Sequence, residues 1–557
     1  MAMSDIGVRL GNMVFKGFEH FTACAMETQE ETLRKIMKQN KNCELGKKYD
    51  FANIHSIKEF QDKVPLSTFE DYLPLVDRIL NDEKNVITSK KIIRYCASSG
   101  SVGKPKIQPK TARDIWNMQC MGFAATPACA ERYFKKNGIA DKLPAQMGPL
   151  VLSLNSHTME NGKKTNGAAQ VPFTYLTPIL KYFTTTPLDI LYPEDEEHTN
   201  IQYFQLRFCL TNRDVTYLGS LVITLLTTMF EYLEANWEMI CNDIEKGTID
   251  PSVACPESLR KKYGNMKPDP KRAEELRAIF KEGFDKEPVA RKIWPKLCWG
   301  YGMIGSTLAV YVEKLRKYVG DLPMHNMGYG ASEGFMAMPV DLDCTDYVLL
   351  PRSIIYEFIP VDGDENARPL TLDQLEVGKD YEIIVTNFSG LYRYRILDIV
   401  RCTGWYNKSP RIEFLYRSNM GLNIANEKTT TQMLDWVIEK LQEKHNIDFK
   451  GFSFYSDVDA ELPRYVLLCE TDADISERKA ELEKDMNEFF KQCNEKYEKY
   501  ISWGMIGAPA IYQLENGAYD EYKASLVAQG RVLNQIKPVT VINTPERKEF
   551  FFSRVKK

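Results

Sequence analysis

A run of serine, glycine and lysine residues between positions 98 and 106 has the chemistry needed to bind phosphate. Its glycines let the backbone approach closely and point N–H groups at phosphate oxygens. Its hydroxyls can donate hydrogen bonds to the same oxygens, and its lysines add positive charge. The residues expected to contact the phosphates are Ser98, Ser99, Gly100, Ser101, Gly103, Lys104 and Lys106. Pro105 stands where a Walker P-loop has Ser or Thr, so on local chemistry alone an exposed turn with solvated lysines is an equally open interpretation.

Residues 391–400 predict a strand in which charges interrupt an apolar and aromatic run. These charges are Arg393, Arg395 and Asp398. Buried charges are costly unless they are paired or used. Asp398 could accept hydrogen bonds from the two hydroxyls of a ribose. The alternative is an internal Arg–Asp ion pair on a partly exposed strand.

A third polar segment contains Tyr329, Ser332 and Glu333, with glycines on both sides of the Ser-Glu pair. These glycines indicate a tight loop that presents polar side chains into a cleft. Glu333 suits Mg²⁺, which prefers a few carboxylates together with substrate phosphates. The alternative is a loop in which Ser332 caps the following turn.

Regular elements must position these segments. Residues 91–97 predict a short buried strand that ends at the serine-rich loop, and residues 111–123 predict a helix with Thr111 as N-cap. Residues 200–246 predict buried helix. Further strands are predicted at 347–350, 354–360, 381–386, 392–396, 412–416 and 465–470, and further helices at 429–444 and 475–500.

The composition is that of a globular protein with more than one domain. The chain has 557 residues, whereas one hydrophobic core stops growing at about 250–300. The net charge of -4 gives no general attraction to nucleic acid or anionic membrane, so neither is predicted as a partner. The most apolar run, 218–233, is too short to span a bilayer and is expected to be a buried core helix.

The cysteines and histidines argue against a structural metal. Thirteen cysteines occur without a Cys-x-x-Cys pair, and the six histidines are scattered. Most cysteines are therefore expected to be buried thiols in a reducing compartment. With no secretory signal visible, we expect a cytoplasmic monomer.

The three polar segments, in their order along the chain, resemble the acyl acid–amido synthetase family of the ANL adenylating superfamily. That family is best known from plant enzymes that conjugate auxin or jasmonate to amino acids. Its serine- and glycine-rich pattern falls on residues 98–106, with one residue fewer before the lysine. Its Gly-Leu-Tyr-Arg-Tyr-Arg-x-Gly-Asp pattern falls on 390–398, where Leu397 replaces the glycine. Its Tyr-x-x-Ser-Glu pattern falls on Tyr329, Ser332 and Glu333.

The resemblance continues towards the C-terminus. Residues 414–419 resemble the linker between the superfamily's two domains, with Arg417 at the position of an arginine that assists the ribose and Asn419 at the hinge. Residues 534–538 resemble a family stretch that carries the C-terminal catalytic lysine, which makes Lys537 the expected residue and Lys523 a rival.

The pattern and the resemblance predict an α/β fold with two domains. A large adenylation domain of several subdomains is expected over residues 1–417, followed by a smaller, mobile α+β domain over 418–557.

The activity implied is that of an ATP- and Mg²⁺-dependent ligase, which converts a carboxylic acid to its acyl-adenylate and passes the acyl group to an amine, expected to be that of an amino acid. The loop at 98–106 would hold the polyphosphate. The other roles implied are Mg²⁺ at Glu333, the α-phosphate at Ser332, adenine at Tyr329, ribose at Asp398 and Arg417, and charge neutralisation by Lys537. Two alternatives stay open: an acyl-coenzyme A ligase, and a nucleotide- or acyl-binding protein without turnover.

The family topology implies an acyl pocket near residues 120–125, 170–175, 205–225 and 300–306. His325 and Arg207 could meet a carboxylate, although each is more often structural. Apolar side chains that can shape the pocket, but that at helical spacing more often belong to a core, are Phe123, Phe173, Tyr175 and Met303.

The Lys537→Ala variant should lose formation of acyl-AMP but keep the reaction of preformed acyl-AMP with the amine, because a lysine on a mobile domain serves one half-reaction. The two half-reactions are measured separately, by pyrophosphate release and by consumption of added acyl-AMP. Lys523→Ala is the matched comparison. An equal loss in both half-reactions would exclude this role for Lys537.

Overall fold

The computed structural model describes residues 3–97, 107–151, 154, 157–159, 161–167, 180–304, 309–361, 367–417, 420–425, 427–528 and 539–556. These residues form two compact units, one containing 3–97 and 107–415 and the other containing 416–556. Helices and strands both occur along the chain, which confirms the mixed α/β class. The domain boundary at 417/418 and the mobility of the second domain stay predictions.

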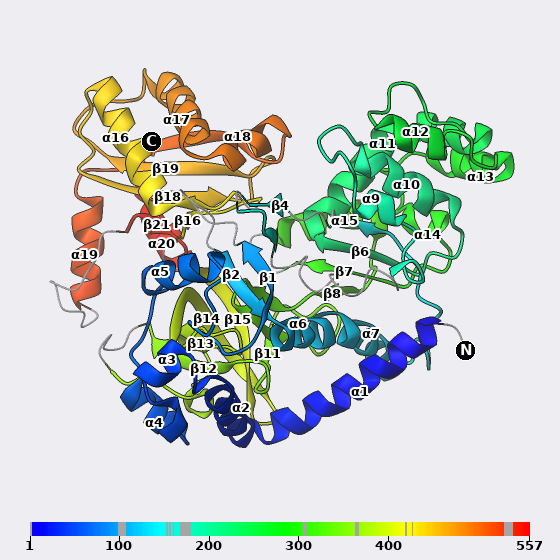
Figure 1. Cartoon of the computed structure of the whole chain (residues 1–557). Helices are drawn as coiled ribbons and strands as arrows, with labels where there is room; N and C mark the ends of the chain where they lie inside the picture. The colour runs from blue at the N-terminus through cyan, green and yellow to red at the C-terminus, as the bar shows by residue number, and fades with distance from the viewer. Residues whose placement is uncertain are drawn as a thin grey trace. The chain divides into compact units, whose positions relative to one another are not determined.

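A seven-stranded sheet lies at the centre of the first unit (Figure 1). Its strands run antiparallel from β12 to β14 and again from β15 to β9. In spatial order they are β12 (Ile355–Pro360), β13 (Asp380–Thr386), β14 (Tyr394–Tyr406), β15 (Ser409–Arg417), β11 (Tyr347–Leu349), β10 (Gly334–Met338) and β9 (Tyr329–Ala331).

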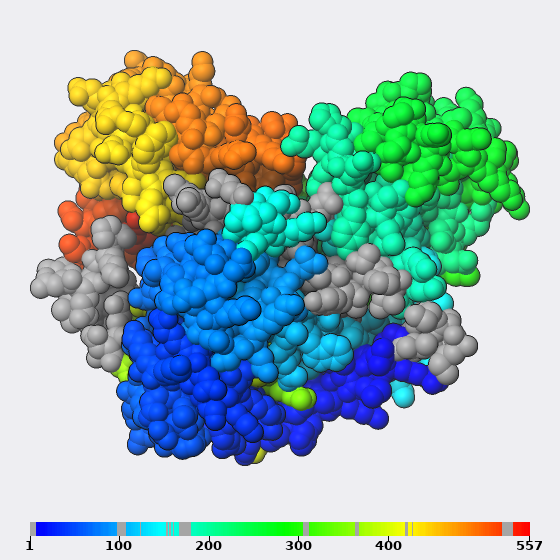
Figure 2. All heavy atoms as spheres, viewed as in Figure 1, coloured from blue at the N-terminus to red at the C-terminus, as the bar shows by residue number. Residues whose placement is uncertain are grey.

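N-terminal helices cover this sheet. Helix α2 (Ala25–Asn40) buries Leu33, Ile36 and Met37, at the i, i+3, i+4 spacing of a single apolar face. In the space-filling view only small patches of the yellow-green strands are visible beneath the blue segments (Figure 2). The other elements of this N-terminal region are α1 (Met3–Ala23), α3 (Glu44–Lys48), η1 (Phe51–Asn53), α4 (Ile57–Lys63) and α5 (Phe69–Leu80).

A smaller sheet flanks the serine-rich loop. Strands β1 (Ile92–Ala97) and β2 (Ile107–Thr111) pair antiparallel, so residues 98–106 connect the two strands of a hairpin. Helix α6 (Ala112–Gln119) follows, with Thr111 at its N-cap position but without a side-chain capping bond. The remaining elements are β5 (Lys164–Gly167) and β4 (His157–Thr158) in the sheet, then η2 (Cys120–Ala124) and α7 (Ala125–Lys136) after α6.

The first unit also contains a parallel sheet in the order β3-β6-β7-β8, with the green helices gathered around it (Figure 1). Its strands are β3 (Leu150–Val151), β6 (Tyr217–Val222), β7 (Trp299–Met303) and β8 (Met324–Asn326). Its helices are α9 (Leu188–Leu191), α10 (Ile201–Thr211), α11 (Ile223–Lys246), α12 (Glu257–Tyr263), α13 (Pro270–Lys281), α14 (Ala290–Ile293) and α15 (Ala309–Val319).

Strand β6 corrects the helix predicted across 200–246. The chain forms α10, then β6, then α11, so the apolar run 218–233 is a strand followed by a helix. A short buried apolar run has no periodicity that separates the two states. Residues 217–222 form a strand here because they pair with β7. Among the described helices, none combines the length and apolarity needed to cross a bilayer.

The second unit is an α+β structure. Its sheet has the order β20-β19-β18-β21, with β18 and β19 antiparallel and the outer pairs parallel. The helix predicted over 475–500 is two helices, because the Asn494 side chain accepts from Lys496 N and Tyr497 N and starts a new one. The strands are β18 (Gly451–Asp457), β19 (Arg464–Glu470), β20 (Gly507–Gln513), β21 (Val541–Ile542) and the hairpin β16 (Met420–Leu422) and β17 (Thr429–Thr430); the helices are α16 (Thr431–His445), α17 (Lys479–Cys493), α18 (Glu495–Ser502), α19 (Ala518–Ala528) and α20 (Pro545–Phe552).

All thirteen cysteines are described, and all are free thiols. Seven are buried. Burial raises the pKa of Cys96 to about 11 and that of Cys129 to about 12, because a low-dielectric interior disfavours the thiolate. These residues are core side chains.

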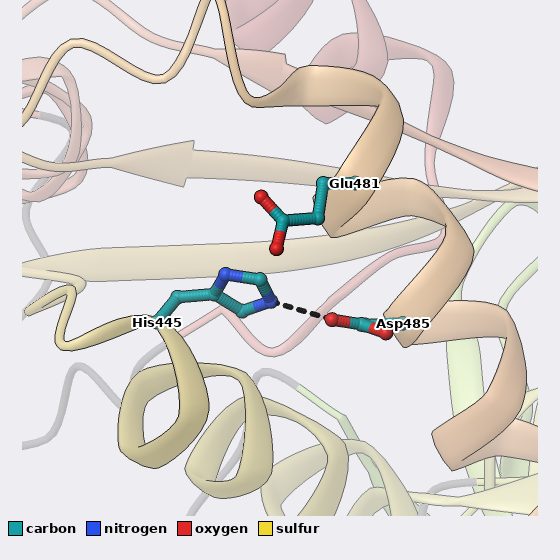
Figure 3. A group of neighbouring side chains, drawn as sticks. All are labelled: His445, Glu481 and Asp485. Carbon is teal, nitrogen blue, oxygen red and sulfur yellow. Dashed lines mark hydrogen bonds and ion pairs between the residues drawn. The ribbon is translucent and has the colours of Figure 1, made fainter.

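Three side chains between α16 and α17 resemble a metal site in their spacing: His445, Glu481 and Asp485 (Figure 3). The ring is already fully bonded. Arg478 donates to His445 Nδ1 at 2.7 Å, so the opposite N–H of the ring donates to Asp485 at 2.8 Å. Lys444 also pairs with Asp485 at 2.8 Å. Cations and donors of the protein itself thus satisfy this cluster, which ties the end of α16 to α17.

The Asp485→Asn variant should lower the stability of the second unit by about 1–3 kcal/mol at pH 7. Burial works to raise the pKa of Asp485, but hydrogen bonds from Lys444 and His445 hold that pKa below its usual range. A depressed folded-state pKa means that the contribution is complete above the unfolded value of about 3.9 and is lost as the pH falls through the folded value. Thermal melts from pH 7 to pH 3 measure this deficit.

The exposed Asp448→Asn is the control for removal of a carboxylate from the same unit. It should melt like the wild type throughout. A deficit for Asp485→Asn that is equal at every pH would contradict the ion pair.

Candidate active site

A buried hydrogen bond joins two of the predicted motifs. The Tyr329 hydroxyl, from β9, donates to Asp398 Oδ2, from β14, at 2.6 Å. Only 7 % of Tyr329 and 2 % of Asp398 are exposed. The two strands are four positions apart in the sheet, which would separate them by about 19 Å if the sheet were flat. The sheet is therefore curled, so that its β9 edge meets β14.

A bulge in β14 aims Asp398 at this contact. Glu382 pairs with Ile399 and Ile384 pairs with Arg395, so one residue of β13 faces three residues of β14. Leu397, in the middle of the three, has φ +65°, in the left-handed region. Bulges bend a strand and re-aim its side chains. The family pattern has glycine at this position, which is the residue best suited to such a backbone.

Aromatic rings surround Tyr329. Its ring lies 5.8 Å from Phe414 and 6.4 Å from Tyr347, measured between centroids. The Tyr347 hydroxyl accepts from Asn326 Nδ2 at 2.6 Å. Tyr329 thus has aromatic neighbours at its ring and a polar partner at its hydroxyl.

The two-residue turn between β9 and β10 contains Ser332 and Glu333, both 7 % exposed. The Glu333 carboxylate accepts from Gln108 Nε2 at 2.7 Å, and its backbone carbonyl accepts from Asn387 Nδ2 at 2.7 Å. Gln108 belongs to β2, directly after the serine-rich loop in the sequence. The predicted metal ligand is thereby held next to the strand that leaves the predicted phosphate loop.

A polar network supports the turn that contains Asn387. The Asn387 Oδ1 atom accepts from Ser389 N and Leu391 N at 3.0 and 3.1 Å. The Ser389 hydroxyl donates to Asp114 and accepts from Thr111 N. Burial raises the pKa of Asp114 above its usual range, against the opposing charge of Lys110. Gly390, at φ +107°, completes the turn where a Cβ would meet Ile87 O at 2.6 Å.

The two arginines of the motif are structural. Arg393 pairs with Glu357 at 2.9 Å, and Arg395 pairs with Glu382 at 2.7 Å. Sequence reasoning expected that any ion pair within this strand would be formed with Asp398. Arg395 instead pairs with Glu382 on the neighbouring strand β13, since neighbouring strands present side chains to each other across the sheet. Arg393, directly before β14, pairs with Glu357 of β12, which lies beyond β13 in the sheet.

Several predicted site residues are not tested. Arg417 ends β15 and belongs to the second unit, so its role at the ribose stays a prediction. Lys523, the rival lysine, is exposed on α19. The predicted residues that lie outside the described ranges are Ser98, Ser99, Gly100, Ser101, Gly103, Lys104, Lys106, Asn419 and Lys537.

Some of the candidate acyl-pocket residues are described and others lie outside the described ranges. Arg207 is buried and donates to the Tyr203 hydroxyl and to Thr248 O, so it binds α10 to the end of α11. Both ring nitrogens of His325 lack a hydrogen-bond partner within the described residues, and burial lowers the pKa of His325 to about 3. Met303 is half-buried at the end of β7. The side chain of Phe123 and residues 173 and 175 lie outside the description.

Four site residues were missed from the sequence: Gln108, Asn387, Phe414 and Asp114. Gln108 offered a signal, because a polar residue inside a short strand next to a phosphate loop is unusual. The others act through partners more than 50 residues away, which a local pattern does not reveal.

Comparisons with known proteins agree along the whole chain. Profiles of the GH3 family match in order: the N-terminal domain over residues 14–324, the central domain over 347–417 and the C-terminal domain over 432–546. The chain is 28% identical over 567 residues to indole-3-acetic acid-amido synthetase GH3.4 of Arabidopsis thaliana, covering 95% of this chain and 92% of the relative. It is 26% identical over 557 residues to jasmonoyl–L-amino acid synthetase JAR4 of Nicotiana attenuata, covering 94% and 92%.

Among solved structures, the fold is similar to that of AtGH3.15 acyl acid amido synthetase in complex with 2,4-DB. The TM-score is 0.65 at 24% sequence identity, over 98% of this chain and 96% of that one. This likeness concerns the fold.

The Leu397→Gly variant should unfold at or above the temperature of Leu397→Ala, although glycine in a strand normally costs about 0.5–1 kcal/mol relative to alanine. The reason is that a left-handed backbone costs an L-residue about 1–2 kcal/mol. Both variants remove the same leucine contacts, so each serves as the control for the other. Differential scanning fluorimetry measures the midpoints. A clearly lower midpoint for glycine would show that the bulge is not left-handed in solution.

Proposed function

The chain belongs to the GH3 family, and on this premise we propose that it activates a carboxylic acid with ATP and joins the acyl group to an amino acid. A carboxylate oxygen bonds to the α-phosphorus of ATP, and the bond from that phosphorus to the bridging oxygen breaks with release of pyrophosphate. The amine nitrogen then attacks the acyl carbonyl carbon. AMP leaves with the electrons of the broken bond, and the amine loses a proton to solvent.

The observation that carries the proposal is the bond from Tyr329 to Asp398, which unites two motifs that are far apart in the sequence. The Tyr329 ring and Phe414 border the adenine. Asp398, oriented by the tyrosine, accepts hydrogen bonds from the ribose hydroxyls, and Arg417 assists it. Because Tyr329 and Asp398 are buried and bonded to each other before binding, the nucleotide loses little free energy in ordering them.

The phosphate side uses the loop at 98–106 and the turn at 332–333. Loop hydroxyls, backbone N–H groups and lysines hold the polyphosphate, and Ser332 lies at the α-phosphate. A buried carboxylate oriented by Gln108 suits a Mg²⁺ ion that is otherwise held by substrate phosphates. Among the described residues, no cluster with the spacing of a complete protein cage includes Glu333. Such an ion would neutralise the charge on the polyphosphate.

The second domain supplies Lys537 for the first half-reaction only. Its ammonium offsets the negative charge that builds on the α-phosphate and the bridging oxygen. Rotation near Asn419 then removes it, which clears the site for the amine. This is gating by a domain motion.

The cysteine content supports a cytoplasmic location. All thirteen thiols are free, and seven of them are buried away from oxidants. Such a pattern is typical of proteins that function in a reducing compartment.

The defining experiment is ATP–pyrophosphate exchange with a panel of carboxylic acids that begins with indole-3-acetate, jasmonate and 2,4-DB, compounds named for the relatives. We expect exchange that depends on at least one acid. In a second step, amino acids or coenzyme A are added to the same acid with ATP, and the products are read by mass spectrometry. Amide products with release of AMP are expected.

The outcomes separate the alternatives. Thioester formation without amide would assign the chain as an acyl-coenzyme A ligase. Nucleotide binding without exchange for any acid would leave a binding protein without turnover. Asp398→Asn is the control within the protein, and it should reduce exchange because an amide offers the two ribose hydroxyls only one acceptor oxygen and no negative charge.

A further inference from the structure

Lys110 is a buried cation that none of the preceding roles uses. It lies in β2, two residues after Gln108, and only 1 % of it is exposed. Its Nζ atom has no hydrogen-bond partner within the part of the chain that the structure describes. An unpartnered buried ammonium is costly, because the interior does not replace the water that it loses. A protein retains such a group when something else binds it.

The register of the hairpin decides where Lys110 points. Side chains alternate between the two faces of a strand, so Lys110 shares a face with Gln108. Cys96 pairs with Gln108 across the hairpin and lies on this face too. Because Gln108 binds Glu333, this face is directed at the turn between β9 and β10.

Electrostatics gives the same location. Burial raises the pKa of the Cys96 thiol, while the Lys110 charge and the Ser332 hydroxyl lower it and the Glu333 charge raises it further. Lys110, Ser332 and Glu333 therefore all lie close enough to the Cys96 thiol to affect its pKa. On the other side, the charge of Lys110 acts on Asp114. The ammonium thus shares one small region with the turn at 332–333.

A second atom of this face is also unsatisfied. Gln108 donates through Nε2 to Glu333, but its Oε1 atom has no partner within the described residues. The face thus presents one positive donor and one acceptor beside Ser332. Native interiors leave few buried polar atoms without a partner, and those that remain need an explanation.

We propose that Lys110 binds an α-phosphate oxygen of the nucleotide and so provides a fixed positive charge at the reacting phosphorus. This inference rests on the proposed function, which places Ser332 at the same phosphate. Lys537 belongs to the second domain, whereas Lys110 belongs to a strand of the first unit. Lys110 therefore serves both half-reactions: it stabilises the charge that develops in adenylation and then the AMP leaving group.

Binding of AMP and adenosine to the full-length protein tests the proposal, because the two ligands differ only in the phosphate. Calorimetry compares the wild type with Lys110→Met, which keeps an unbranched side chain, shorter by only the terminal atom, and removes the charge. We expect AMP affinity to fall at least about tenfold, as for loss of a charge-assisted hydrogen bond, and adenosine affinity to stay unchanged. Lys91→Met, an exposed change of the same kind just before β1, should alter neither.

Thermal stability is the second readout. Without ligand, Lys110→Met should melt at or above the wild-type temperature, since it removes an unpaired buried charge. If Lys110 instead acts as the counter-ion of Asp114 or Glu333, Lys110→Met should melt below the wild-type temperature. A lower midpoint with equal losses of AMP and adenosine would overturn the proposal.

Three further outcomes are decisive. If neither Lys110→Met nor the alternative Lys110→Gln yields folded protein, the ammonium maintains the fold and the proposal is wrong. If the wild type prefers AMP to adenosine and the variant keeps that preference, Lys110 does not contact the phosphate, while the nucleotide site stands. A wild type that binds neither ligand contradicts the proposed function itself.

Discussion

The curl of the seven-stranded sheet is the constraint on which the candidate site depends. Strands β9 and β14 are four positions apart, yet Tyr329 and Asp398 are joined by a hydrogen bond of 2.6 Å. The bulge around Leu397 breaks regular pairing between β13 and β14, and bulges bend a strand. The same bulge contains Asp398, so the distortion that bends β14 also orients this carboxylate. Backbone strain at such a place is stabilised by the surrounding structure.

Around this contact, the first unit builds its site from turns that hold one another. The turn at 332–333 is fixed by Gln108 from the β1–β2 hairpin and by Asn387 from the turn after β13. The turn that contains Asn387 is itself held through Ser389, which bonds to Thr111 and Asp114 at the start of α6. Each turn binds side chains of another segment, so none can relax alone. A site assembled in this way is positioned before any substrate arrives.

Local patterns predicted the elements but not their partners. The strands near 354–360 and 381–386 and the helix near 429–444 could be read from apolar spacing and turn residues, and the structure contains them as β12, β13 and α16. The glycine-to-leucine change at 397 was visible in the sequence, whereas its left-handed backbone was not, since that depends on pairing with β13. The partner of Arg395 escaped prediction for the same reason, and that of Arg393 lies one strand further away, on β12. Strand β6 was taken for helix, because a buried apolar run lacks periodicity.

The thiols described above have a consequence for how this protein fails. Seven cysteines are sealed within the folded chain, where thiolate formation is suppressed. Unfolding of either unit would expose its thiols in a chain that has no disulfide to guide pairing. In an oxidising solution, random cross-links between the exposed thiols would then block refolding. The lifetime of the folded protein outside a reducing compartment is therefore set by the rate at which a unit first unfolds. It is not set by an equilibrium between folded and unfolded states.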